Sequence, residues 1–411
     1  MKRILIFSLA YYPHVSGAEI AVREITDRIN PSDIEFHLIC NRYDTSLPKT
    51  ERVGTVHVHR IGFGRKRVDI AETYGPLFYL AKILFIPLAV LKARTLHRTY
   101  HFDGLWAVMA YMTFPVTLLR LVGVRLPYVL TLQEGDSFGR VFERWRIRLV
   151  RPLLTYGIRH AAVVQAISSF LGGWARRAGF DGPLEIIPNG VDVSLFSKAL
   201  SPEDRTAIRK KCLGDRDGTL VLHVGRIVPK NGIEDTIEAL TYLPSDISFV
   251  QVGAGPDKEK LVAHAGKLGV SDRVRFLGCI DHSELPKYFH AADIFVQPSL
   301  SEGMGNVFIE AFAARVPVVA TQVGGIADFL YDPERNPGYA PTGRAVDAHD
   351  PKGIARAILA YLENREVTGQ IVENAYALVK EKYDWDRIAH DMRTRVFSGI
   401  GLTHTAKENR L

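Results

Sequence analysis

The chain has 411 residues, a formal net charge of +7, and 47% hydrophobic and 24% charged residues. This composition is that of an ordinary soluble protein, and the length predicts two or three domains, each large enough for its own core. Residues 1–190 carry 25 Lys and Arg against 15 Asp and Glu, a net of +10, whereas the remaining 27 and 30 give −3. The first half therefore holds all of the basic excess.

The three cysteines, Cys40, Cys212 and Cys279, lie far apart and form no Cys-x-x-Cys pair. Their spacing argues against a disulfide framework or zinc site and for a reducing compartment, so we expect a cytoplasmic protein. The N-terminal sequence MKRILIFSLA mimics a short signal peptide, but no small-x-small cleavage site precedes Tyr11. We interpret it as a first strand instead.

Strands and helices alternate along the whole chain. The pattern predicts a buried strand at Arg3–Leu9, a loop up to Gly17 and an amphipathic helix at Ala18–Ile29. Further predicted strands are Glu35–Cys40, Thr55–Ile61, Gly104–Val108, Tyr128–Leu132 and Ala162–Ala166. A second Rossmann-like unit is predicted from Thr219, with strands at Leu220–Val224, Phe249–Val252, Val274–Leu277, Ile294–Gln297 and Val318–Ala320. This alternation is typical of α/β folds with parallel sheets.

Two basic stretches in the first half point to a charged partner. Residues 65–101 hold seven Lys or Arg and two Asp or Glu, and they include the apolar run Leu77–Leu91, which Lys82 and Pro87 interrupt. The run falls short of the ~18 apolar residues of a membrane span. Two interpretations stay open: a helix lying in an anionic membrane interface, or a core-facing helix with a solvated basic edge.

The second basic stretch, Phe138–His160, carries six Arg and one Glu among aromatic residues. Such a mixture also suits nucleic acid, but nothing here resembles a nucleic-acid-binding module. We therefore expect no nucleic-acid partner and favour membrane headgroups, which would place the protein peripherally on the cytoplasmic face of the membrane.

The segment Val296–Gly325 contains the densest group of candidate site residues. Glu302 follows a predicted strand, and Glu310 stands eight residues later in a predicted helix. Carboxyl ends of parallel strands are where open α/β sheets bind ligands. Gly303 and Gly305 would leave backbone N–H groups open beside the helix N-terminus, which suits a phosphate. One carboxylate could then accept sugar hydroxyls and the other ribose hydroxyls, with a diphosphate between them.

These residues resemble the Glu-x7-Glu motif of glycosyltransferase family 4, and the resemblance covers nearly the whole chain. Ile187–Asp192 matches the family's Ile-Pro-Asn-Gly-Val-Asp signature at the interdomain linker, and Gly253–Pro256 its Gly-x-Gly-Pro loop. Arg226 matches the arginine that points at the donor diphosphate. The first loop, Ser16–Glu19, has a single glycine where the family often has two.

Two further positions depart from the family pattern. A lysine is expected five residues after Arg226, but Asn231 stands there and Lys230 comes one place earlier. After the strand Tyr128–Leu132, relatives commonly have a histidine, whereas this chain has Gln133, which forms hydrogen bonds but cannot carry a proton.

The resemblance implies a GT-B fold of two facing Rossmann-like domains with a C-terminal helix crossing back to the first. It implies an acceptor-binding domain at residues 1–193, a nucleotide-sugar-binding domain at 194–384, and a returning helix and tail at 385–411. The implied activity is transfer of a sugar, with retained configuration, from a UDP- or GDP-sugar to the hydroxyl of a glycan or lipid-linked acceptor. No cofactor is expected.

The resemblance also assigns roles to individual residues. It implies catalytic roles for Glu302, Arg226, Lys230 and Gln133. It implies donor binding by Glu310, Gly303, Met304, Gly305, Asn306, Gly17, Asn231 and Gly253. It implies acceptor binding by Asp136 and Glu19, although Asp136 also fits an ordinary loop N-cap.

We expect no metal site. Two Asp-x-Asp triplets, Asp215–Asp217 and Asp384–Asp386, have the spacing that metal-dependent glycosyltransferases use, but neither follows a buried strand. Two other functions remain open. Gln133 and the shifted Lys230 fit a non-catalytic nucleotide-sugar-binding protein or partner subunit, and the fold would also fit a sugar-nucleotide epimerase or phosphorylase.

Overall fold

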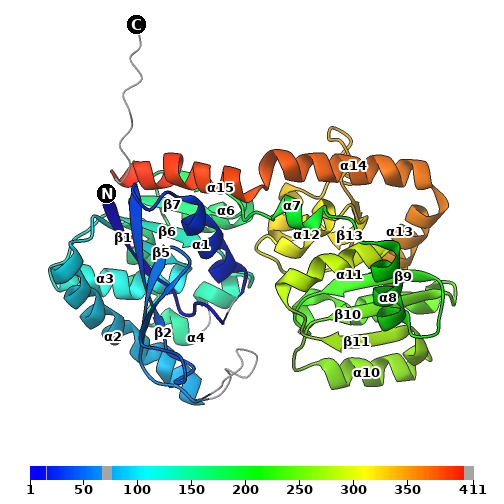
Figure 1. The fold of residues 1–411 in the computed structure, drawn as a ribbon, viewed down its shortest axis with the longest axis horizontal. Coiled ribbons are helices and arrows are strands. Elements are labelled where there is room, and N and C mark those ends of the chain that lie inside the picture. The colour runs from blue at the N-terminus through cyan, green and yellow to red at the C-terminus, as the bar shows by residue number, and fades with distance from the viewer. Residues whose placement is uncertain (15, 67–75, 144, 402–411) are drawn as a thin grey trace, which may run out of the picture. The chain divides into compact units, whose positions relative to one another are not determined.

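The computed structural model describes residues 1–14, 16–66, 76–143 and 145–401. The chain forms two compact units (Figure 1). The N-terminal unit comprises Met1–Asn189 and the segment from Trp385 onward, and the C-terminal unit comprises Gly190–Asp384. Each unit is a sheet with helices packed against it, so the predicted α/β class with two Rossmann-like units is confirmed.

The sheet of the N-terminal unit has the order β3-β4-β2-β1-β5-β6-β7-β8. Its strands are β1 (Lys2–Phe7), β2 (Ile34–Asn41), β3 (Thr50–Val53), β4 (Val56–Ile61), β5 (Gly104–Val108), β6 (Tyr128–Leu132), β7 (Val163–Ala166) and β8 (Leu184–Ile186). All neighbours pair in parallel except β3, which runs antiparallel to β4. The carboxyl ends of β5, β6 and β7 therefore lie at the same edge of this sheet.

Helices α1 (Gly17–Arg28), α2 (Pro76–Tyr100), α3 (Thr113–Leu121), α4 (Trp145–Arg148), α5 (Arg151–Arg159), α6 (Ser169–Arg177) and α15 (Trp385–Asp391) belong to this unit. α1 packs on α15, whereas α3 packs on both α2 and α5. Short turns η2 (Ala110–Met112), η3 (Gly139–Glu143), η9 (Met392–Phe397) and η10 (Ser398–Ile400) complete it.

The sheet of the C-terminal unit is parallel throughout, with the order β11-β10-β9-β12-β13-β14. Its strands are β9 (Thr219–Val224), β10 (Ile247–Val252), β11 (Val274–Gly278), β12 (Ile294–Gln297), β13 (Val318–Thr321) and β14 (Arg344–Val346). Its helices are α7 (Val193–Phe196), α8 (Pro202–Leu213), α9 (Ile233–Ala239), α10 (Lys258–Lys267), α11 (Leu285–Ala291), α12 (Asn306–Ala313), α13 (Pro351–Glu363) and α14 (Arg365–Lys382).

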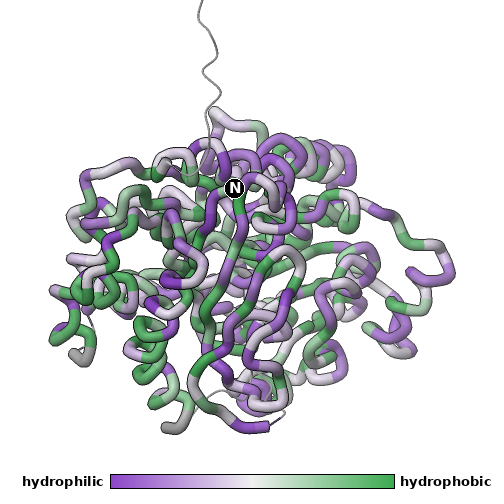
Figure 2. Tube along the Cα trace, turned by 60° about the vertical axis from the view of Figure 1, so that its left-hand side comes forward, coloured by the Kyte–Doolittle hydropathy of each residue, from purple (hydrophilic) through white to green (hydrophobic). Residues whose placement is uncertain are grey.

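The apolar side chains along the strands explain why both sheets are buried. β5, β6, β9 and β12 are apolar runs with hardly an exposed position, which is how strands covered on both faces read. Hydrophobic stretches interleave with hydrophilic ones along the whole trace (Figure 2). Each unit has its own hydrophobic core.

The last helix lies in the core of the N-terminal unit, as predicted. Trp385, Met392 and Phe397 are buried in the same hydrophobic cluster as α1 and the strands β1 and β2. The ring of Phe397 lies 5.2 Å from that of Trp106 and 6.0 Å from that of Phe36. The segment after the C-terminal unit is therefore an integral part of the N-terminal core.

Several elements differ from the sequence analysis. The strands β3, β8 and β14 were not predicted, because β3 is a half-exposed edge strand and β8 and β14 have only three residues each. α2 extends beyond Leu91 to Tyr100 and contains Pro87 within it. The apolar run Leu77–Leu91 covers only part of this helix, because its last turns are basic and polar.

Replacing Phe397 with alanine should remove the ring contacts with Phe36 and Trp106 and leave a cavity. We expect the free energy of unfolding of the N-terminal unit to fall by about 3–5 kcal/mol. All four tryptophans lie in this unit, so denaturation followed by tryptophan fluorescence reports on it. Leu149→Ala, at an exposed side chain, is the control; equal unfolding curves for the two variants would contradict the assignment.

Candidate functional site

The predicted donor residues gather at the carboxyl ends of β9 and β12. The two strands are neighbours in the sheet, so the loops that follow them meet at the same edge. Gly225 and Arg226 follow β9, and the loop from Pro298 to Gly305 follows β12. This is the edge where open parallel sheets bind ligands.

The turn that carries Arg226 and Lys230 is fixed to the β12 loop. The Asn231 side chain donates a hydrogen bond to the Arg226 backbone oxygen at 2.7 Å, and the Leu300 amide donates to the Lys230 backbone oxygen at 2.7 Å. Gly232 has φ +68°, and a Cβ there would lie 2.1 Å from the Pro298 oxygen. Asn231 thus supports the loop through its buried side chain, while Arg226 is exposed and Lys230 is half-buried.

The loop that carries Glu302 is also fixed by close backbone contacts, as the turn with Arg226 is. The Gly325 amide donates to the Glu302 backbone oxygen at 3.1 Å, and a Cβ on Gly324 would lie 1.9 Å from that oxygen. Glu302 is half-buried, and its Oε1 accepts the Gly303 amide at 3.0 Å. The expectation that the Gly303 N–H is unshielded is therefore wrong in this structure, because the neighbouring carboxylate already binds it.

Helix α12 begins directly after this loop. Gly305 caps it with φ +86°, and Asn306 is its first, half-buried residue. The Met304 side chain is buried, so only its backbone is available to a ligand. The loop therefore offers backbone amides around a helix N-terminus rather than a set of side chains.

Glu310 lies on α12 with its carboxylate buried. Its Oε1 is 2.9 Å from Nε2 of His282, while Oε2 has no hydrogen-bond partner among the described residues. A buried carboxylate oxygen without a donor is costly, so this oxygen suits a ligand hydroxyl. His282 follows β11 in the short turn η7 (His282–Glu284). It was not predicted from the sequence, because no local motif marks it.

Gly253 ends β10 next to these loops. Its amide donates to the Gly278 oxygen at 2.7 Å, and a Cβ at this position would lie 2.1 Å from the Gly225 oxygen. Its φ of +125° also favours glycine. Gly253 thus lets the loops after β9, β10 and β11 approach one another.

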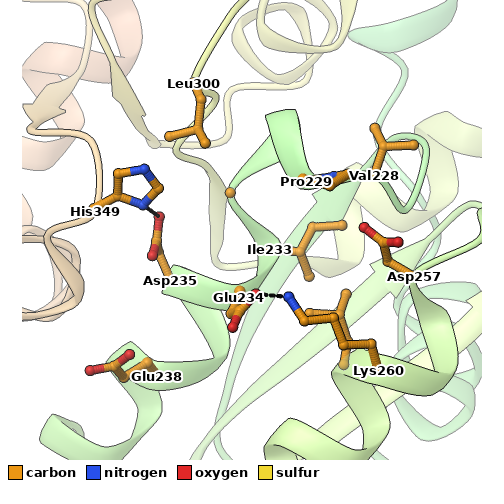
Figure 3. Close-up of a pocket in the computed structure, with 12 residues that line it drawn as sticks. Val228, Pro229, Ile233, Glu234, Asp235, Glu238, Asp257, Lys260, Leu300 and His349 are labelled. Carbon is orange, nitrogen blue, oxygen red and sulfur yellow. Dashed lines mark hydrogen bonds and ion pairs between the residues drawn. The ribbon is translucent and has the colours of Figure 1, made fainter.

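A separate pocket of the same unit lies beside this turn (Figure 3). Glu234, Asp235, Glu238 and Asp257 line it, and the cationic side chain in its wall, Lys260, is paired with Glu234 at 2.6 Å. Four carboxylates repel a diphosphate, so this pocket does not suit the phosphates of a nucleotide.

In the N-terminal unit, Gln133 lies at the carboxyl end of β6. Its Oε1 accepts a hydrogen bond from the side chain of Asn189, at 3.3 Å. Asn189 belongs to the Ile-Pro-Asn-Gly-Val-Asp signature, so this motif orients the amide that replaces the family histidine. Asp136 lies three residues on and pairs with Arg140 on the surface, at 3.1 Å.

Gly17 and Glu19 form the start of α1, apart in the sequence from Gln133. Gly17 is the first, exposed helical residue. The Glu19 carboxylate is buried and accepts hydrogen bonds from the Ser16 amide at 2.7 Å and the Ser16 hydroxyl at 2.6 Å. Burial raises the pKa of Glu19, while the Ser16 hydrogen bonds lower it. The carboxylate predicted to bind an acceptor thus serves as a helix cap.

Glu134 is a residue that the sequence analysis did not single out. It is buried beside Gln133, its Oε1 accepts the Ala110 amide at 2.5 Å, and its Oε2 has no partner among the described residues. Met109, just before that amide, has φ +74°, a strained backbone conformation. Burial raises the pKa of Glu134 to about 6. Glu134 therefore stabilises the turn that follows β5.

The two Asp-x-Asp triplets do not form ligand clusters in the part of the chain that the structure describes. There, only Glu35, His37 and His57 bring three ligand atoms of the usual metal-binding types close together. Arg216, inside one triplet, pairs with Asp272, and Asp386 of the other pairs with Arg28.

Two family models match this chain in tandem. "Glycosyl transferase 4-like domain" matches residues 16–190, and "Glycosyl transferases group 1" matches residues 204–378. Together they span nearly all of the two units. The fold and the motifs define a glycosyltransferase of the GT-B class, and the chain belongs to glycosyltransferase family 4.

Named relatives agree with this family. The chain is 29% identical over 383 residues to the alpha-D-kanosaminyltransferase of Streptomyces kanamyceticus, which covers 89% of this chain and 95% of the relative. It is 32% identical over 241 residues to a GDP-mannose-dependent alpha-(1-6)-phosphatidylinositol monomannoside mannosyltransferase of Mycobacterium tuberculosis, 55% of this chain and 59% of the relative. Other curated relatives are matched over 61%, 52% and 60% of their length.

Solved structures share the fold. Sucrose-phosphate synthase from Thermosynechococcus elongatus superposes with a TM-score of 0.78 at 22% identity, over 96% of this chain and 98% of that one. Alr3699/HepE of Anabaena, in complex with UDP-glucose, superposes with a TM-score of 0.75 at 22% identity, over 97% and 100%.

The raised pKa of Glu134 predicts a pH-dependent stability. As pH rises from 4.5 to about 6, the unfolded state loses this proton before the folded state does, so folding stability falls. Glu134→Gln removes this loss. Relative to wild type, the variant should gain about 2 kcal/mol between pH 4 and pH 7, as measured by urea unfolding with tryptophan fluorescence. Glu143→Gln, at a surface ion pair with Arg177, is the control. Parallel pH curves for Glu134→Gln and wild type would contradict the assignment.

Proposed function

We propose that this protein transfers a sugar from a nucleoside diphosphate sugar, UDP- or GDP-linked, to an acceptor hydroxyl, with retained anomeric configuration and without a metal ion. The observation that carries the proposal is Glu310, whose buried Oε2 has no hydrogen-bond partner among the described residues while His282 holds Oε1. This geometry suits a ribose hydroxyl that donates to Oε2.

The domain proposed at residues 194–384, which lies within the C-terminal unit (Gly190–Asp384), would bind the donor. Glu302 and the backbone of Met304 to Asn306 would hold the sugar and a phosphate, while Asn231 and Gly253 shape the loop. Arg226 and Lys230 would stabilise the negative charge that grows on the diphosphate as the bond from the anomeric carbon breaks. Two cations in this role make a metal ion unnecessary.

The domain proposed at residues 1–193, of which Met1–Asn189 lie in the N-terminal unit, would bind the acceptor, and the helix within 385–411 completes the core of that unit. Gln133 would hydrogen-bond the transferred sugar and Asp136 the acceptor, with Gly17 and Glu19 shaping the first loop. Since Gln133 cannot take a proton, the acceptor proton would pass to an oxygen of the leaving phosphate. The new bond then forms on the same face of the sugar as the old one.

Titration calorimetry with UDP, GDP and their sugars, in EDTA, tests the donor site. We expect one nucleotide to bind with micromolar affinity, and Glu310→Ala to weaken it at least tenfold because the ribose loses its acceptor. Glu284→Ala, on a surface glutamate paired with Lys287, is the matched control. Equal affinity of Glu310→Ala and wild type would contradict the role of Glu310.

Turnover separates this proposal from the other functions. NMR of the product reports the anomeric configuration, and an inverted product would overturn retention. Donor binding without transfer to any acceptor in a broad panel would favour a non-catalytic subunit. Conversion of the donor with no acceptor present would favour an epimerase.

We also propose that α2 lies on an anionic membrane, so that the acceptor is lipid-linked and the protein acts at the cytoplasmic face. Its outward face is apolar over several turns, with Tyr79, Ile83 and Leu91 exposed by 54%, 49% and 62%. The opposite face, with Phe85 and Ala89, is buried. In the described part of the chain, no helix has the length and hydropathy to cross a membrane.

A basic pocket of the same unit supports an anionic lipid as the partner. Arg148, Arg151, Arg159 and His160 line it beside α5, and Leu149 next to it is 83% exposed. Within the described residues, no carboxylate forms an ion pair with these three arginines. Cations beside exposed apolar side chains suit a phosphate headgroup at a membrane surface. The mannosyltransferase relative is named for a phosphatidylinositol-linked acceptor.

Vesicle sedimentation tests this surface. Wild type should bind vesicles containing phosphatidylglycerol, bind less in high salt, and bind weakly to pure phosphatidylcholine. Ile83→Glu and Leu91→Glu should lower binding severalfold, because each buries a charge in the interface. Val262→Glu, at an exposed apolar residue of α10, is the control; a loss of binding no greater than that of the control would contradict the proposal.

A further inference from the structure

A cluster of histidines lies in the N-terminal unit, away from the sheet edge where β5, β6 and β7 end. His37 on β2 and His57 on β4 are direct neighbours in the parallel register, and Glu35 lies two residues before His37. The three side chains are on the sheet face that α2 covers, near its last residue, Tyr100. Glu35 and His37 stand near the amino end of β2, opposite the ends that carry Gln133 and Glu134.

We propose that Glu35, His37 and His57 form a site for a divalent transition metal such as Zn²⁺. Their Oε1 and ring nitrogen atoms lie within 4.8 Å of one another. Glu35 Oε1 is 2.9 Å from His37 Nε2 and 3.9 Å from His57 Nε2. Ligand atoms of tetrahedral zinc are about 3.3 Å apart, so small side-chain rotations would bring all three into range.

Neighbouring groups orient these ligands in the way that metal sites need. Arg3 donates to Glu35 Oε2 at 2.9 Å, which leaves Oε1 directed at the two histidines. His37 Nδ1 lies 3.2 Å from His59 Nε2, so an Nδ1 proton donated to His59 presents the Nε2 lone pair to the metal. Metal-bound histidines usually have such a hydrogen bond on the second nitrogen.

The His37–Glu35 contact is compatible with metal binding. With the proton on Nε2, His37 donates to the Glu35 carboxylate at 2.9 Å; with the proton on Nδ1, the Nε2 lone pair and the carboxylate are two acceptors that a cation can bridge. The His57 side chain is 41% exposed, so it can turn toward the ion and the fourth position is open to water.

This donor set uses no cysteine, so the cysteine spacing that argued against a zinc site does not bear on it. The Asp-x-Asp triplets do not contribute to it either. Because these residues lie at the opposite ends of the strands from Gln133, the site would stabilise β2 and β4 rather than take part in sugar transfer.

Cobalt titration tests the site, on protein with any polyhistidine tag removed. Wild type should bind one equivalent of Co²⁺ with micromolar or tighter affinity, give the visible absorption of four-coordinate Co²⁺, and release it to Zn²⁺. His57→Ala should weaken binding at least tenfold and remove the absorption. His390→Ala, at an exposed histidine of α15, should bind like wild type.

A second variant and a second readout keep the test decisive. Glu35→Gln removes the anionic ligand and should also weaken binding, and Zn²⁺ should raise the melting temperature of wild type but not of either ligand variant. Absence of Co²⁺ binding to folded wild type, or equal binding by His57→Ala, would overturn the proposal. Neither result bears on the donor site.

Discussion

Close backbone packing at one edge of the C-terminal sheet is the constraint on which the candidate site depends. Gly253, Gly232 and Gly324 each stand where a Cβ would lie about 2 Å from a backbone oxygen of a neighbouring loop. Because these positions exclude side chains, the loops after β9, β10, β12 and β13 touch one another. The loop that carries Arg226 is thereby fixed beside the loop that carries Glu302 through backbone contacts at these glycines. The positions of the two charged residues thus depend on how closely the glycines let the loops pack.

Buried polar groups give the two units different chemical character. In the C-terminal unit, Glu310 is held by His282 through one oxygen only, which leaves capacity for a further hydrogen bond. In the N-terminal unit, Glu19 and Glu134 serve their own backbone at a helix start and a strained turn. Glu134 also has one oxygen without a partner among the described residues, so the difference lies in the other oxygen: in Glu310 it contacts the His282 side chain, whereas in Glu134 it accepts a backbone amide.

The sequence predicts the fold well because apolar strands and family motifs agree. β5, β6 and β12 have the bounds that the pattern gives, whereas the short edge strands β3 and β14 leave too weak a signal. Site prediction is less complete. Asn231, read as a donor ligand, binds the Arg226 backbone, and His282 and Glu134 were missed, since hydrogen bonds between residues far apart in the chain leave no local pattern.

The position of the last helix has a consequence for synthesis of the chain. The C-terminal unit is one continuous segment, Gly190–Asp384, whereas the N-terminal unit is interrupted by it. On the ribosome, β1 to β8 emerge first but lack Trp385, Met392 and Phe397, which complete their hydrophobic core. The N-terminal unit is therefore synthesised first but completes its hydrophobic core last. Its apolar face stays uncovered while nearly two hundred residues are added. Exposed hydrophobic surface of this kind is prone to aggregation until it is covered.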